Sequence, residues 1–157
     1  MTTNLNKTRR IALWAIPAVL VLGGVAFGAK MLMPAPADLD YALTRPSDLG
    51  TFTATVAPAT DPIVIEEPQT WTVEIAMADG TSPDLADITV DGGMPQHGHG
   101  FPTKPRITRE VDEGTYLLEG MKFSMTDWWD LKLGIQGAGG ADAVVFNIVV
   151  DPTTQRH

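Results

Sequence analysis

Two of the three histidines of this chain lie two residues apart in a glycine-rich stretch. The segment GGMPQHGHGFP, residues 92–102, places His97 and His99 on either side of Gly98, with Met94 just upstream. Imidazole binds zinc, nickel or copper, and a thioether shifts the preference towards copper, above all Cu(I). Side chains two residues apart point to one face of an extended chain, so we expect both imidazoles to reach a single ion. The spacing therefore predicts a copper site, for Cu(I) or Cu(II), in this loop.

Two other interpretations of the loop stay open. A zinc site usually recruits a third His, a carboxylate or a Cys, and Asp91 lies close enough in the sequence to serve. Alternatively, Met94 fills the core and both histidines are turn residues exposed to solvent. A pair of histidines at this spacing is a less specific signal than the fixed four-ligand patterns of structural zinc sites.

A second stretch supplies another thioether. In MKFSMTDWWDLKL, residues 121–133, Met125 has the same strand parity as Phe123, so in an extended chain both face one side. Met125 could then complete a site of two methionines and two histidines with Met94, His97 and His99, and the methionines favour copper over zinc. The alternative is that the methionine and aromatic side chains of this stretch are core residues. In a further interpretation, Trp128 caps a cuprous ion through its ring face.

Catalysis has little support in the sequence. The third histidine, His157, is the last residue, so no Ser–His–Asp order can be composed. No glycine-rich loop leads from a strand into a helix to hold phosphate, and no two carboxylates pair at a defined site. We therefore predict a binding protein and not an enzyme.

The elements that must position these residues have the two-residue period of half-buried strands. Short apolar–polar alternations are separated by glycine, proline and aspartate turns, and they lie at residues 51–57, 70–77, 87–92, 106–111, 112–120, 128–135 and 143–150. Such spacing predicts an all-β, immunoglobulin-like antiparallel β-sandwich. The residues expected in its interior are Trp71, Val73, Ile75, Leu131, Leu133, Phe146 and Ile148.

An apolar run precedes this domain. Residues 11–29 carry no charge and follow Lys7, Arg9 and Arg10, and nineteen residues of helix span roughly 30 Å, the thickness of the hydrocarbon core of a bilayer. Basic residues on the N-terminal side keep that end in the cytoplasm. We therefore expect one transmembrane helix, in a cytoplasmic (inner) membrane, with the domain facing the periplasm or the cell exterior. The alternative is a signal peptide cleaved after residues 35–37, Ala-Pro-Ala.

This organisation divides the chain into a cytoplasmic N-terminus (1–10), an anchor (11–33), a linker (34–50) and the β-sandwich (51–151). Residues 38–157 carry seven basic and nineteen acidic side chains, a formal charge of −12. Such a charge argues against nucleic acid as a partner of the exported domain. The chain has no cysteine, which excludes disulfides and thiolate metal sites.

The two ligand stretches also carry a family resemblance. GGMPQHGHGFPTKP, followed by DEGTYLLEGMKFSMTDWWDLKL and a final apolar strand, resembles the YtkA-like (FixH-related) domain over residues 67–150. One departure is that Asp127 stands where the family pattern has glycine. The resemblance implies a small, membrane-anchored, extracytoplasmic β-sandwich. It also implies a role in copper handling, or in the assembly of membrane metalloenzymes such as haem–copper oxidases. The alternative function is that of a metal-free assembly subunit whose loop and Trp-rich strand contact a membrane complex.

Overall fold

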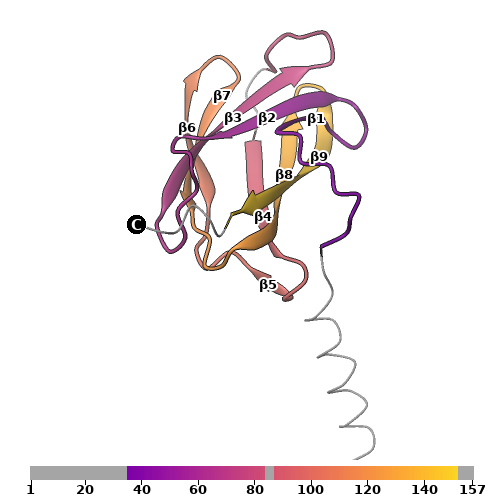
Figure 1. The fold of residues 1–157 in the computed structure, drawn as a ribbon. Helices are drawn as coiled ribbons and strands as arrows, with labels where there is room; N and C mark the ends of the chain where they lie inside the picture. Colours follow the sequence, from indigo (N-terminus) through magenta and orange to yellow (C-terminus); the bar gives the residue numbers. More distant parts are fainter. Residues whose placement is uncertain (1–34, 84–86, 152–157) are drawn as a thin grey trace, which may run out of the picture. The chain divides into compact units, whose positions relative to one another are not determined.

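The computed structural model describes residues 35–83 and 87–151, and the regular elements of these two ranges are all β-strands. The strands are β1 (Thr44–Pro46), β2 (Phe52–Pro58), β3 (Gln69–Met77), β4 (Asp87–Met94), β5 (His99–Gly100), β6 (Arg106–Asp112), β7 (Thr115–Met121), β8 (Asp127–Gly137) and β9 (Gly140–Val150). They form a five-stranded sheet in the order β1-β2-β3-β7-β6 and a four-stranded sheet in the order β5-β4-β8-β9, both antiparallel (Figure 1). The predicted all-β antiparallel sandwich is confirmed.

The interior of the sandwich is built by the alternation seen in the sequence. In β3 and β8 every second side chain is buried, as expected for strands with one face towards the core. All seven residues predicted for the interior are at most 4% exposed: Trp71, Val73, Ile75, Leu131, Leu133, Phe146 and Ile148. The core prediction is therefore confirmed.

A short first strand and the turn after it are tied to the second sheet. β1 pairs with β2 and occupies part of the range 34–50 that the sequence analysis assigned to a linker. The Asp142 carboxylate on β9 accepts hydrogen bonds from Ser47 Oγ at 2.6 Å and from the backbone N–H groups of Leu49 and Thr51. This carboxylate thus connects the β1–β2 turn to the opposite sheet.

The predicted membrane anchor, residues 11–33, lies outside the described residues. Within residues 35–83 and 87–151, none of the chain forms a helix of the length and apolarity needed to cross a bilayer.

Three strands position the histidine loop. β4 lies between β8 and the two-residue β5, and the loop is the turn that joins β4 to β5. In Figure 1 this hairpin projects from the end of the second sheet. Three of the four candidate ligands, Met94, His97 and His99, are therefore carried on a short hairpin whose base pairs with β8.

Candidate metal centre

The histidine loop is a tight turn and not a segment of extended chain. The Met94 carbonyl accepts hydrogen bonds from the backbone N–H groups of His97 (3.0 Å) and Gly98 (2.9 Å). Gly98 has φ +68°, a left-handed conformation that glycine adopts at little cost. The expectation that strand alternation would align the two histidines is therefore wrong, because His97 lies in the four-residue turn that reverses the chain while His99 begins β5.

The turn nevertheless brings the two imidazoles together. The ring centroids of His97 and His99 are 5.9 Å apart, with 29° between the ring planes. A metal ion lies about 2.0 Å from each ligating ring nitrogen, so two rings that share one ion have centroids within roughly 6.4 Å of each other. The observed separation is inside this limit. The two imidazoles are thus close enough for both to bind one ion.

A backbone carbonyl orients the His99 ring. His99 Nδ1 lies 3.0 Å from the carbonyl oxygen of Gly100, and since a carbonyl only accepts, Nδ1 is the donor of this hydrogen bond. In the neutral imidazole Nε2 then has the lone pair and is the nitrogen available to a metal ion. A backbone carbonyl that orients the imidazole in this way is a common feature of protein metal ligands.

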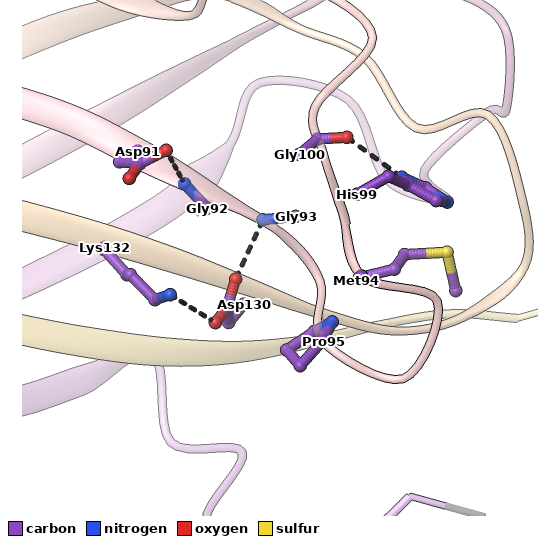
Figure 2. A pocket seen from close by; sticks show the side chains of 10 residues that line it. Asp91, Gly92, Gly93, Met94, Pro95, His99, Gly100, Asp130 and Lys132 are labelled. Carbon is purple, nitrogen blue, oxygen red and sulfur yellow. Dashed lines mark hydrogen bonds and ion pairs between the residues drawn. The ribbon is translucent and has the colours of Figure 1, made fainter. Parts of the chain in front are cut away.

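Met94 lies beside His99 on the same side of the hairpin. The two residues are directly opposed partners of β4 and β5, and opposed residues have their side chains on the same face of a sheet. Met94 is 0% exposed and packs in the core, whereas His99 is exposed. Figure 2 shows the Met94 thioether and the His99 imidazole projecting to the same side of the hairpin. Met94 is thus both a core residue and a neighbour of a candidate ligand.

The close approach of the strands at the hairpin base requires two glycines. A Cβ on Gly92 would lie 2.2 Å from the Asp130 carbonyl oxygen, and a Cβ on Gly93 would lie 2.2 Å from the His99 carbonyl oxygen. No side chain fits at either position without moving the backbone. The double glycine therefore has a steric role: it lets β4 pack against β8 on one side and β5 on the other.

Asp130 is a residue of this site that the sequence analysis did not identify. Its Oδ1 accepts the Gly93 N–H at 2.8 Å, and its Oδ2 is 3.0 Å from Lys132 Nζ. Along β8 Asp130 alternates with the apolar residues that face the core, a pattern typical of exposed side chains. Asp130 is nevertheless only 6% exposed. No local signal distinguishes it from other strand aspartates, because its burial depends on the pairing of β8 with the glycine pair of β4.

The second methionine, Met125, and the histidine loop both contact Trp129. Met125 is 41% exposed, and its carbonyl oxygen accepts a 3.1 Å hydrogen bond from Trp129 Nε1. The ring of Trp129 in turn lies 5.7 Å from the His99 ring, at 68° between planes. The structure therefore gathers His97, His99 and Met94 on one hairpin, while the backbone of Met125 is hydrogen-bonded to an indole whose ring also contacts His99.

The tryptophan against the histidine loop is Trp129 and not Trp128. Trp128 has the opposite strand parity, and its Nε1 donates to Asn147 Oδ1 at 3.0 Å. The interpretation of Trp128 as a cap over the ion therefore does not agree with the structure, because alternation along β8 directs Trp129 inwards and Trp128 to the other face of the sheet.

Asp127, which stands where the family pattern has glycine, has a backbone conformation that favours glycine. Its φ is +98°, which lies in the region that favours glycine, and its Oδ1 accepts the Trp128 N–H at 2.8 Å. The departure from the pattern thus changes the residue type but keeps a glycine-like turn between Met125 and β8.

An open pocket of about 270 Å³ lies at the base of the hairpin (Figure 2). Residues of β4, β5 and β8 line it, among them Asp91, His99, Asp130 and Lys132. Asp91, the carboxylate considered for zinc, accepts the Gly92 N–H at 2.8 Å. Within residues 35–83 and 87–151, no three or more His, Asp or Glu side chains group in a way that could hold a metal ion. The candidate set His97, His99, Met94 and Met125 consists of two imidazoles and two thioethers.

The fold and this hairpin define a small β-sandwich protein with a His- and Met-bearing loop at the end of one sheet. The chain belongs to the YtkA-like family, whose profile matches residues 49–134. This confirms the resemblance seen in the sequence, and the matched range contains all four candidate ligands.

Other comparisons add little to the family assignment. No curated protein matches the chain. Among solved structures, a DUF4785 family protein from Legionella pneumophila is similar at 12% identity and a TM-score of 0.44, over 64% of this chain. This chain spans only 28% of that protein. The ZirS C-terminal domain is similar at 12% identity and a TM-score of 0.41, over 73% of this chain and 80% of that domain.

Proposed function

We propose that this chain is a membrane-anchored, extracytoplasmic copper-binding module that serves copper delivery or the assembly of a membrane metalloenzyme. The observation that supports this most directly is the hairpin that holds the His97 and His99 rings 5.9 Å apart. Met94 is the strand partner of His99 on the same hairpin. Residues 11–33 would anchor the chain, and the domain would face the periplasm or the cell exterior.

The chemistry of the candidate ligands suits copper in both oxidation states. Imidazole nitrogens bind Cu(II) well, and thioether sulfurs add affinity for Cu(I). His99 presents Nε2, since its Nδ1 is held by the Gly100 carbonyl. Met125, which is partly exposed, is the thioether that can move most freely to complete the site. The family resemblance adds support, because YtkA-like proteins are associated with copper handling.

A titration of the soluble domain, residues 36–157, with Cu(I), Cu(II) and Zn(II) tests the proposal. Wild type is compared with the His97→Ala/His99→Ala double variant. We expect wild type to bind one copper ion and the double variant to lose most of its Cu(II) affinity, because both imidazoles are removed. We expect Met125→Leu to weaken Cu(I) binding selectively, because leucine keeps the volume but has no sulfur.

The third histidine of the chain provides the matched control. His157→Ala removes an imidazole from the terminal residue, and its copper affinity should equal that of wild type. Circular dichroism establishes that each variant is folded. If the double variant binds Cu(I) and Cu(II) as tightly as wild type, the histidine loop is only a turn, and the metal-free assembly role becomes the better account.

A further inference from the structure

One side chain contacts both segments that carry candidate ligands. Trp129 is fully buried on β8. Its ring lies 5.7 Å from the His99 ring, and its Nε1 donates a 3.1 Å hydrogen bond to the Met125 carbonyl oxygen. The histidine hairpin and the segment before β8 are therefore connected through a single indole.

The orientation of that indole is set by the aromatic side chains packed around it, which extend into the core from the segments that follow β5 and β7. Phe101 stacks on Trp129 with a centroid distance of 5.5 Å and 8° between the planes. Phe123 meets the ring edge-on at 5.3 Å and 86°. Aromatic contacts of this geometry are favourable and fix the rotamer of a buried ring. The direction of the Trp129 N–H, and with it the position of the Met125 carbonyl, follows from core packing.

We propose that Trp129 is a positioning residue that holds Met125 towards the histidine pair and thereby sets how strongly the site prefers Cu(I) to Cu(II). The copper part of this inference rests on the proposed function. Met125 lies in the segment between β7 and β8 and is 41% exposed. The hydrogen bond to Trp129 restrains the backbone of this residue against the core. Since the thioether is the ligand that favours Cu(I), release of Met125 would reduce Cu(I) affinity more than Cu(II) affinity.

The substitution Trp129→Phe separates these contributions. Phenylalanine keeps an aromatic ring in the cluster but removes the N–H that bonds Met125. Outer-shell substitutions at metal sites commonly reduce affinity by roughly 10- to 100-fold, and we expect a loss of this size for Cu(I) with little change for Cu(II). Equal losses for both oxidation states would overturn the proposal.

Trp71 offers a matched control in the same cluster. It is also fully buried and packs against Phe123 at 6.2 Å. In the described part of the chain its Nε1 has no hydrogen-bond partner. Trp71→Phe therefore removes the same atoms from the core without breaking a hydrogen bond, and we expect wild-type preference between Cu(I) and Cu(II). If Trp71→Phe weakens Cu(I) binding as much as Trp129→Phe does, the effect is one of core packing, and the proposal fails.

A double-mutant cycle with Met125→Leu tests whether Trp129 acts through Met125. If it does, the Trp129→Phe/Met125→Leu double variant binds Cu(I) no more weakly than Met125→Leu alone, because the ligand that Trp129 positions is already missing. Losses that multiply in the double variant would mean that Trp129 acts independently of Met125, which would overturn the inference.

A measurement on the metal-free protein separates this inference from the proposed function. Backbone amide order parameters of residues 124–126 should fall in Trp129→Phe and stay at wild-type values in Trp71→Phe. Unchanged values in Trp129→Phe would overturn the positioning role even if copper binds. If wild type binds no copper, the proposed function fails, while the order parameters still decide whether Trp129 holds Met125.

Should Trp129→Phe not fold, the Trp129 indole NMR signal of wild type is followed instead. We expect its N–H to exchange with solvent more slowly than that of the equally buried Trp71, whose N–H has no hydrogen-bond partner in the described part of the chain, and equal exchange rates contradict the inference.

Discussion

Single residues at this site carry constraints that their types alone do not reveal. Asp127 has the φ of a glycine, +98°, at the point where the Met125 segment enters β8. Non-glycine residues in such conformations cost on the order of 1–3 kcal/mol and persist where the surrounding structure determines them. The hydrogen bond from the Trp128 N–H to the Asp127 carboxylate compensates part of that cost.

We therefore predict that Asp127→Gly raises the free energy of unfolding by about 1 kcal/mol. The relief of backbone strain exceeds the extra entropy that glycine gives to the unfolded chain, which is roughly 0.5–1 kcal/mol. Urea denaturation measures the difference. Asp87→Gly is the control, because Asp87 is also exposed and on a strand but does not have a positive φ, so glycine there should destabilise. A loss of stability in Asp127→Gly would contradict the predicted strain.

At the scale of elements, the β4–β5 hairpin depends on close contact between backbones. Gly93 lies between the His99 carbonyl of β5 and the Asp130 carboxylate of β8, which accepts its N–H. Both contacts must be made for His99 to lie against Trp129. The geometry of the candidate site is thus a property of three paired strands and not of the loop alone.

Substitution of Gly93 by alanine should open the hairpin. The added Cβ would meet the His99 carbonyl oxygen at 2.2 Å, and overpacking of this kind typically costs 1–3 kcal/mol. We expect a fall in stability of about that size, with faster amide exchange at residues 97–100 as the local measurement. Gly137→Ala is the control, since its Cβ would have only ordinary contacts at 3.5 Å. Equal exchange rates in Gly93→Ala and wild type would show that the hairpin tolerates the methyl group.

At the scale of the whole domain, one carboxylate joins the two sheets at the edge formed by β1 and β9. Burial of Asp142 acts to raise its pKa. Hydrogen bonds from Ser47 Oγ and from the backbone N–H groups of Ala143, Leu49 and Thr51 outweigh this effect, and they hold the pKa well below its ordinary value. The carboxylate form is therefore bound more favourably in the folded state than in the unfolded chain.

This lowered pKa predicts the acid sensitivity of the fold. Because the folded pKa lies below the unfolded value of about 3.9, the stabilisation is complete above that pH and is lost as the pH falls below it. Urea midpoints measured from pH 7 to pH 2 should decline less in Asp142→Asn, which begins from a lower stability at pH 7. Asp48→Asn, at an exposed aspartate of the same turn, should follow the wild-type curve. Parallel curves for Asp142→Asn and wild type would refute the assignment.

The amino-acid sequence by itself determined seven of the nine strands, the buried face of β3, β8 and β9, and the position of the histidine loop. These features depend on local patterns: a two-residue period needs only the few residues of one strand, so Trp71, Leu131 and Leu133 could be assigned to the core without knowledge of their neighbours. The loop after β4 was also recognisable from its glycines and proline, although its tight turn and the short strand β5 were not.

The arrangement of the candidate site was decided only by the tertiary structure. The burial of Asp130, the register that sets Met94 opposite His99 and the contact of His99 with Trp129 all join residues from different strands. The proximity of His97 to His99 arises from a turn and not from strand alternation. Such relations depend on which strands pair and in what register, and these follow from packing of the whole core, which no short stretch of sequence encodes.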